Sequence, residues 1–437
     1  MRRWITWLVL VAWLVLALSA PASAAPREIA VLKVKGPINP VVAVYLKRAI
    51  SEAESRAQAV VLQLDTPGGL DTAMRDIIQD ILAARIPVVV YVSPSGARAA
   101  SAGAFITMAG HVAAMAPGTV IGAAHPVASG GGELSKTMDE KVVNDAAAYI
   151  RIIAGQRGRN AEWAEKAVRE SVSATDQEAL KDGIIDIVAP DIPSLLEQLN
   201  GREVVLSQGR VTLNTQGLGG RELLNMEMSA IENFLYTISD PNIAYILLSL
   251  AMVGIFLELA NPGSILPGVV GGIALLLAFY SLGMLPVNYV GVALIGLAFL
   301  LFLVEIWVSS HGVLAVGGVA AFILGSLVLL STSAPYFTID RRLIVAVSLV
   351  LGIFFAFIAA LLVRDFRRRS MVGRNGLVGK LAVARTTLDP EGMVFLEGER
   401  WQATLEAGTA EKGEEVVVSK VKGLKLRVAK LEGGSRK

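Results

Sequence analysis

Ser101 is the first side chain whose surroundings suggest chemistry. It lies in the stretch VVVYVSPSGARAASAGAFITM, where a β-rich run and a turn precede small residues that predict a helix start. Unpaired N–H groups at a helix N-terminus favour negative charge, and small neighbours leave room for a substrate backbone. A serine at this position can also be a plain N-cap. The stretch is not the G-x-S-x-G elbow of the α/β-hydrolases, because Ala99 replaces the first glycine.

A glycine-rich turn offers hydrogen-bond donors for a reacting carbonyl. The segment LDTPGG, residues 64–69, follows another β-rich run. A Pro-Gly-Gly turn can present backbone N–H groups in conformations that glycine tolerates best. Together with the N–H of Ala102, such donors are what an oxyanion hole requires. An ordinary strand-ending turn would have the same sequence.

Two side chains are candidates for the general base that a serine nucleophile needs. Lys141 lies near the start of a predicted helix over residues 139–153, after the glycine-rich loop at 129–132. A lysine acts as a base only where desolvation holds its amine neutral. His125, in the segment GAAHPV, competes for this role because an imidazole needs no special burial. The spacing alone leaves both residues open.

The elements that must position these residues form an α/β pattern between residues 25 and 200. Short β-rich runs alternate with helical stretches, which favours a largely parallel sheet covered by crossover helices. The β-rich runs are residues 29–34, 60–64, 88–92 and 184–188, and helical stretches include 41–55 and 71–84. Residues 201–241 are expected to form a connector with a hairpin over 203–213.

The N-terminus predicts export. Arg2 and Arg3 precede an apolar stretch, and Ala22-Ser23-Ala24 is typical of a cleavage site, so residues 1–24 predict a signal peptide. The apolar stretch is slightly long, which keeps an uncleaved anchor as the alternative. With either outcome, the α/β domain is delivered outside the cytoplasm.

Residues 242–363 predict a membrane domain of about five helices. Each apolar run is close to the roughly 20 residues that span a bilayer. Arginines at 364 and 367–369 follow the last run and predict a cytoplasmic C-terminus, which agrees with five spans after an external domain. The protein is therefore expected in the cell membrane as a multi-pass protein. The runs are residues 243–260, 265–285, 288–308, 312–332 and 343–363.

The remaining residues, 371–437, predict a small β-barrel. Five short β-rich runs separated by glycine-rich and charged turns are typical of an OB-fold. Stacking aromatics are nearly absent and the net charge is only +2, which argues against nucleic acid as a partner. The chain has no cysteine and only three histidines, so neither a metal site nor a cofactor is expected.

The motifs together resemble one family. LDTPGG, ASAGAFI, MAPGTVIGAAHPV, KVVNDAAAYI and GRN occur here in the order found in the long-form NfeD proteins, membrane-bound serine proteases of the ClpP/crotonase class. The resemblance covers essentially the whole chain, including NPGSILPG in the apolar region and the C-terminal barrel.

The resemblance implies a fold of repeated β-β-α units and a Ser–Lys dyad, here Ser101 and Lys141. It also implies an oxyanion hole from Gly69 and Ala102, and a stomatin-type (SPFH) partner whose apolar segment is cut. The more distant Clp protease subunits use histidine, which keeps His125 as the alternative base.

The sequence thus predicts a membrane-bound serine endopeptidase that acts on a polypeptide and forms a homodimer or a higher homo-oligomer. The rival hypothesis is a non-catalytic membrane scaffold that binds and organises stomatin-type partners. The large share of the chain in apolar runs and barrel supports the scaffold, whereas Ser101, Lys141 and the Pro-Gly-Gly turn support the enzyme.

Overall fold

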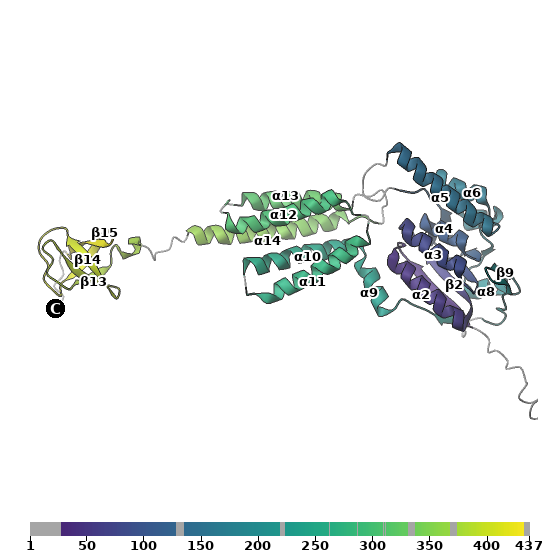
Figure 1. Ribbon diagram of the computed structural model, residues 1–437, viewed down its shortest axis with the longest axis horizontal. Coiled ribbons are helices and arrows are strands. Elements are labelled where there is room, and N and C mark those ends of the chain that lie inside the picture. Colours follow the sequence, from purple (N-terminus) through teal and green to yellow (C-terminus); the bar gives the residue numbers. More distant parts are fainter. Residues whose placement is uncertain are drawn as a thin grey trace, which may run out of the picture. The chain divides into compact units, whose positions relative to one another are not determined.

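The structure is a computed structural model (Figure 1). It describes residues 28–127, 135–218, 223–261, 263–285, 287–308, 310, 312–330, 337–367 and 374–431. Its contacts divide the chain into two units, residues 1–308 with 313–353, and residues 309–312 with 354–437. The expected signal peptide over 1–24 lies outside the described residues.

A six-stranded sheet forms the centre of the N-terminal domain. All its neighbouring strands pair in parallel, in the order β11-β1-β2-β3-β5-β8. Alternate residues of these strands enter two separate cores, which shows that both faces are covered. The strands are β1 (Glu28–Lys35), β2 (Ala57–Asp65), β3 (Val88–Val92), β5 (Val112–Met115), β8 (Ile187–Val188) and β11 (Leu223–Asn225).

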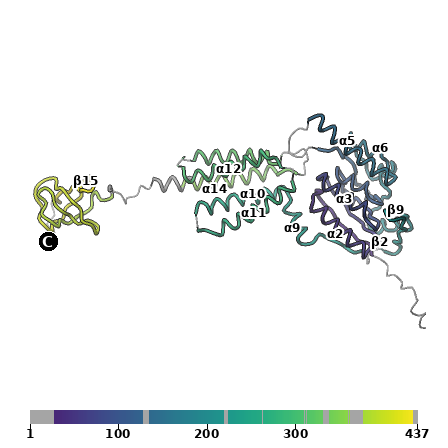
Figure 2. The backbone as a smooth tube through the Cα atoms, viewed as in Figure 1, coloured from purple at the N-terminus to yellow at the C-terminus, as the bar shows by residue number. Residues whose placement is uncertain are grey.

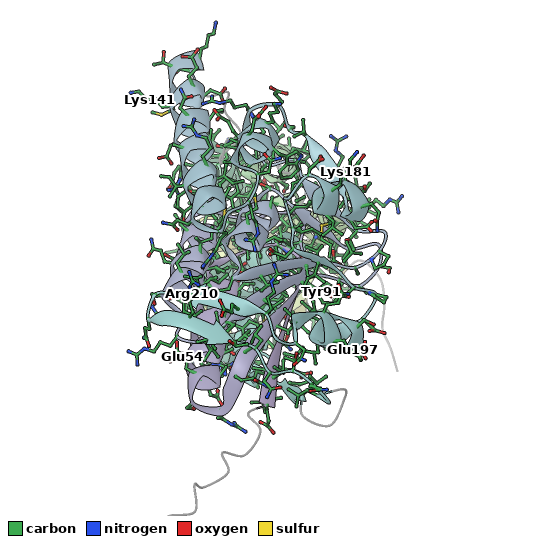
Figure 3. The ribbon with its side chains drawn as sticks, turned by 90° about the vertical axis from the view of Figure 1, so that its right-hand side faces the viewer. Glu54, Tyr91, Lys141, Lys181, Glu197 and Arg210 are labelled. Carbon is green, nitrogen blue, oxygen red and sulfur yellow. The ribbon has the colours of Figure 1, made fainter. Side chains whose placement is uncertain are left out.

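The helices begin where the sequence supplies caps. Asn39 accepts a hydrogen bond from the N–H of Val42 at 3.0 Å, and Pro40 occupies the first helical turn of α2. One face of the sheet is covered by α2 (Pro40–Arg56), α3 (Asp71–Ala83), α4 (Ala102–Ala109), α5 (Lys136–Gln156), α6 (Ala161–Arg169) and α7 (Asp176–Lys181). The other face is covered by α8 (Ile192–Leu199) and the hairpin that follows it. The first two turns of α5 stand out from the domain, as the position of Lys141 in Figure 3 shows.

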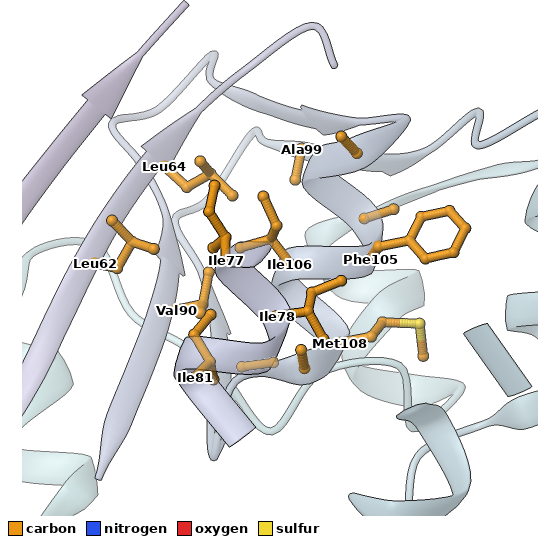
Figure 4. Packing of buried hydrophobic residues seen from close by; sticks show 14 of the residues in the cluster. Leu62, Leu64, Ile77, Ile78, Ile81, Val90, Ala99, Phe105, Ile106 and Met108 are labelled. Atoms are coloured by element: carbon orange, nitrogen blue, oxygen red, sulfur yellow. The ribbon is translucent and has the colours of Figure 1, made fainter. Parts of the chain in front are cut away.

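A second, three-stranded sheet explains the repeated units. It contains β4 (Arg98–Ala100), β6 (Val120–Gly122) and β7 (Ser173–Thr175), in that order. In β3-β4-α4 and again in β5-β6-α5, the first strand joins the large sheet and the second joins the small one. The predicted fold of repeated β-β-α units is therefore confirmed. Figure 4 shows α3 and α4 packed on the large sheet through Ile77, Ile81 and Ile106.

The segment expected as a connector, residues 201–241, adds to the N-terminal domain. Its predicted hairpin is β9 (Glu203–Leu206) with β10 (Gly209–Thr212). Strand β11 then forms an edge of the large sheet beside β1, and α9 (Ala230–Ile238) packs on α2 through the ion pair of Arg48 and Glu232. The domain therefore continues well beyond residue 200.

Five apolar helices follow, drawn as green coils in Figure 2. They are α10 (Pro241–Ala260), α11 (Ile265–Gly283), α12 (Tyr289–Trp307), α13 (Val313–Leu329) and α14 (Arg341–Arg367). Four of them are long and apolar enough to cross a membrane, and α13, with 17 residues, is just shorter. Glycines let neighbouring helices approach closely: a Cβ on Gly254 would lie 2.8 Å from the Cα of Gly271 in α11, and one on Gly291 would lie 2.5 Å from the Cα of Leu329.

The C-terminal residues form a closed barrel with the order β12-β13-β14-β16-β15. Only β14 and β16 pair in parallel, as in an OB-fold. The predicted five-stranded barrel is thus confirmed. Its elements are a short η2 (Arg374–Leu377) followed by β12 (Leu381–Ala384), β13 (Glu391–Leu396), β14 (Glu399–Leu405), β15 (Glu415–Lys422) and β16 (Lys425–Lys430).

Candidate functional site

Ser101 occupies a strained turn between β4 and α4. Its backbone has φ 53° and ψ −117°, a combination that side chains with a Cβ rarely adopt. The side chain makes no capping hydrogen bond to the helix that it precedes. Capping therefore does not explain the serine, and a strained residue at a strand-to-helix turn is typical of a functional site.

Thr66 joins the Pro-Gly-Gly turn to this serine segment. Its N–H donates to the carbonyl of Arg98 at 2.8 Å, and its own carbonyl accepts from the N–H of Ala100 at 3.1 Å. A Cβ on Gly103 would lie 2.6 Å from Cγ2 of Thr66, so only glycine fits there. The Pro-Gly-Gly turn and the serine segment, which the sequence analysis expected to act together, are therefore in direct contact through Thr66.

The backbone of Gly69 is held by Ile38. The N–H of Ile38 donates to the carbonyl of Gly68 at 2.8 Å, and the N–H of Leu70 donates to the carbonyl of Ile38 at 2.9 Å. In a parallel bridge of this kind, the N–H of the central residue points to the opposite side. Within the described residues, the N–H of Gly69 has no acceptor. It is a free donor.

Ala102 supplies a second free donor. It is the first residue of α4, where a helix has no internal acceptor for its N–H. No acceptor for this N–H occurs in the part of the chain that the structure describes. The free N–H groups of Gly69 and Ala102 therefore belong to the two segments that Thr66 joins.

His125 lies on the segment that supports Ser101. The N–H of Ser101 donates to the carbonyl of Gly122 at 3.0 Å, and His125 follows three residues later. Its Nδ1 lies 2.8 Å from the carbonyl oxygen of Val168. Because a carbonyl can only accept, Nδ1 must be the donor, and a neutral ring then keeps its lone pair on Nε2. This is the tautomer that a base would use.

Lys141 is exposed, and none of the described residues gives it the burial expected of a neutral lysine. It lies one turn before Asp145, whose carboxylate pairs with Arg75 of α3. One turn beyond Asp145, Tyr149 stacks on Phe105 of α4 with ring centroids 6.2 Å apart. These contacts fix α5 over α3 and α4 from Asp145 onward. The structure thus joins the segments of Ser101, Ala102 and Gly69 but leaves Lys141 on the projecting turns of α5 (Figure 3).

The sequence analysis did not identify two arginines that bind the carboxyl end of α4. Arg159 donates to the carbonyls of Met108 and Gly110 and pairs with Asp186 at 2.7 Å, and Arg157 donates to the carbonyl of Ala109 at 2.9 Å. They neutralise the partial negative charge at the carboxyl end of the helix that begins after Ser101. The GRN motif, residues 158–160, was the available signal.

Burial lowers the pKa values of two side chains near the carboxyl end of α4, Arg157 and His111. It lowers the pKa of Arg157 to about 10, with Arg159 adding to the effect. It also lowers the pKa of His111 to about 3, so that this histidine is neutral at ordinary pH. His111 does not compete as a base for Ser101, because such a low pKa makes it a weak base and Ser101 lies at the opposite end of α4. The third histidine, His311, lies outside the described residues, and those described contain no cluster suited to a metal ion.

Fold and site together define a membrane protein that carries a ClpP/crotonase-class domain with a serine at a strained strand-to-helix turn. Three domain families match the chain in sequence: the NfeD1b N-terminal domain over residues 28–194, the NfeD integral membrane domain over 242–361, and the NfeD-like C-terminal, partner-binding domain over 374–430. The chain belongs to the NfeD family of membrane-bound proteases.

Two relatives match nearly end to end. The membrane-bound protease PH1510 of Pyrococcus horikoshii is 36% identical over 98% of this chain and 99% of its own length. The membrane protein NfeD1b of Bacillus subtilis is 29% identical over 94% of each chain.

Solved structures of the 1510-N membrane-bound stomatin-specific protease are also similar. A serine-to-alanine variant is 38% identical, with 47% of this chain and 99% of that chain covered and a TM-score of 0.43. A lysine-to-alanine variant with a substrate peptide is 36% identical, with 49% and 98% covered and a TM-score of 0.44.

Proposed function

We propose that this chain is a serine endopeptidase whose nucleophile is Ser101. The observation that carries the proposal is the strained backbone of Ser101, which is followed by the free N–H of Ala102 and is joined through Thr66 to the turn that holds the free N–H of Gly69. A strained serine that makes no capping bond, with free backbone N–H groups in its own segment and in the segment joined to it, suits attack on a carbonyl. Homology over nearly the full length to a membrane-bound protease supports the same reaction.

The reaction has two steps. Ser101 Oγ attacks the scissile carbonyl while the base takes its proton, and the N–H groups of Gly69 and Ala102 stabilise the oxyanion by about 3 kcal/mol per donor. The base returns the proton to the leaving amine, and the acyl group stays on Ser101. Water, deprotonated by the same base, then releases the acid and restores the serine.

Lys141 is the proposed base, with His125 as the alternative. Because Lys141 is exposed, catalysis requires that the projecting turns of α5 be covered, since a lysine amine must be desolvated to act as a base. Met138 and Val142 flank it on the same turns and are 49% and 38% exposed, which provides an apolar surface for such a cover. The substrate or a second copy in the expected homodimer or higher homo-oligomer could supply it.

The proposed substrate is an apolar segment of a stomatin-type membrane protein, bound in an extended form through its backbone. The family resemblance supports this substrate class. The C-terminal barrel matches a family of partner-binding domains, which supports a second contact with such a partner. The proposed reaction needs neither a cofactor nor nucleic acid.

The proposed topology places the protease domain outside the cytoplasm and the barrel inside. It rests on the predicted signal peptide and on the arginines after the last apolar run. Protease added to spheroplasts should then digest residues 25–240 and spare a tag placed after residue 437.

The rival function is a scaffold that binds stomatin-type partners without cutting them. The exposure of Lys141 favours it, because an exposed lysine is a poor base. Labelling of the purified chain with a fluorophosphonate, which reacts with activated serines, distinguishes the two. An enzyme gives an adduct on Ser101 that is lost in Ser101→Ala, whereas a scaffold gives no adduct.

A further inference from the structure

Helix α9 has three different faces. On a helical wheel with about 100° per residue, Glu232 and Tyr236 share one side, and Ile231 and Phe234 share another. Glu232 receives two hydrogen bonds from Arg48, at 2.7 and 2.8 Å, and Tyr236 donates to the carbonyl of Lys35 at 2.9 Å. This side therefore binds the N-terminal domain. The polar residue Asn233 lies about 160° from Ile231, on the far side.

The apolar face of α9 is open. Ile231 is 73% exposed and Phe234 is 50% exposed within the part of the chain that the structure describes. Glu232 is the only charged residue among the nine of α9, and its carboxylate points to Arg48. Nothing charged on α9 therefore opposes transfer of this face into an apolar environment.

The carboxyl end of α9 is attached to one end of the apolar helices. Ser281, two residues before α11 ends, donates to the carbonyl of Ile238, the last residue of α9. Helix α10 begins three residues later, at Pro241. A nine-residue helix is about 14 Å long, so Ile231 and Phe234 lie within about 14 Å of the point where α10 begins and α11 ends.

We propose that Ile231 and Phe234 dock on the lipid surface of the membrane that α10 and α11 cross. An apolar helix face held within this distance of two span ends meets the boundary of headgroups and acyl chains, where such faces bury about 5–10 Å deep. Tyr289, 86% exposed at the first position of α12, is an aromatic residue of the kind enriched at that boundary. The inference does not depend on the proposed proteolysis.

Docking of α9 would also hold the protease domain at the membrane. Tyr236 packs on Gly36, where a Cβ would lie 2.4 Å from its hydroxyl, and Gly36 donates its N–H to Asp65 at 2.9 Å. Asp65 ends β2, directly before the turn that contains Gly69. A protease domain held at the membrane suits a substrate segment that is itself buried in the membrane.

The test uses single cysteines in the full chain, which has none of its own. Ile231→Cys, Phe234→Cys and the matched control Asn233→Cys carry an environment-sensitive fluorophore in lipid nanodiscs. All three side chains are exposed, so the changes leave the core intact. The lipids are brominated in the upper part of the acyl chain, where they quench a fluorophore in contact with them.

We expect blue-shifted emission and quenching by the brominated lipids at positions 231 and 234, and neither effect at 233. Equal, water-like emission at all three positions would overturn the proposal. Blue-shifted emission at 231 and 234 without lipid quenching would also overturn it, because a second copy or another protein would then cover the face.

Discussion

Ile38 and Gly69 face each other in an isolated parallel bridge, with hydrogen bonds of 2.8 and 2.9 Å on either side of Gly69. The bridge fixes the direction of the Gly69 N–H, because both neighbouring peptide groups are used. It also brings the backbone so close that a Cβ on Gly69 would lie 2.1 Å from the carbonyl oxygen of Ile38. Glycine is therefore required for the contact and for the direction of the donor.

Gly69→Ala should impair catalysis strongly. The added methyl forces the turn away from Ile38 and moves the N–H from its place, and loss of one oxyanion donor lowers kcat about 10²–10³-fold. Steady-state cleavage of an apolar peptide measures the effect. Gly155→Ala in α5 is the matched control, since a Cβ there meets nothing within 4 Å. A wild-type kcat for Gly69→Ala would show that the N–H of Gly69 is not an oxyanion donor.

Arg159→Gln should destabilise the N-terminal domain. Arg159 is 7% exposed and bonds two carbonyls of the α4 end together with Asp186. Removal of one partner of a buried ion pair costs about 3–5 kcal/mol of unfolding free energy. We expect the lower value, about 3 kcal/mol, because Arg202 still pairs with Asp186. Urea denaturation measures the free energy of unfolding. The surface pair of Arg151 and Glu165 provides the control, for which Arg151→Gln should cost under about 1 kcal/mol.

The ion pair of Arg48 and Glu232 should make the attachment of α9 sensitive to acid. The hydrogen bonds from Arg48 lower the pKa of Glu232 from 4.5 to about 2. Because the folded pKa is the lower one, the pair stabilises the fold fully above pH 4.5 and loses its effect as pH falls toward 2. The free energy of unfolding of wild type should therefore approach that of Glu232→Gln over this range. A constant difference between them would contradict this assignment.

Several features could be predicted from sequence because they depend on local patterns. Ser101 before a small-residue helix and the Pro-Gly-Gly turn after β2 were both recognisable from residue types. The strain at Ser101 was not, because it arises from tertiary hydrogen bonds. The carbonyl of Gly122 receives the N–H of Ser101, while Thr66 fixes the neighbouring strand β4. Such bonds join segments that are distant in sequence.

The exposure of Lys141 could not be predicted for a related reason. Its helix has the same sequence period whether or not its first turns are covered, and the contacts of Asp145 and Tyr149 begin only one turn later. The role of Arg159 was hidden similarly. Its partners, Met108 and Gly110, lie about 50 residues earlier, so no local pattern connects them.

The pH dependence of cleavage distinguishes the two candidate bases. A lysine base must lose a proton that lysines usually hold up to about pH 10, so the rate should rise through the alkaline range. Lys141→Ala should then be nearly inactive, and Lys141→Arg should not restore activity, because arginine stays protonated. A rate that has already levelled off below the alkaline range, with His125→Ala as the inactive variant, would assign the base to His125 instead.

Cleavage by the full chain in lipid or detergent shows whether Ser101 is the nucleophile. Wild type and Ser101→Ala are incubated with an apolar peptide, and the products are identified by mass spectrometry. Ser101 makes no capping bond, so Ser101→Ala should unfold at the same urea concentration as wild type. We predict cleavage by wild type and none above background by the folded variant. Cleavage at the wild-type rate by Ser101→Ala would show that Ser101 is not the nucleophile.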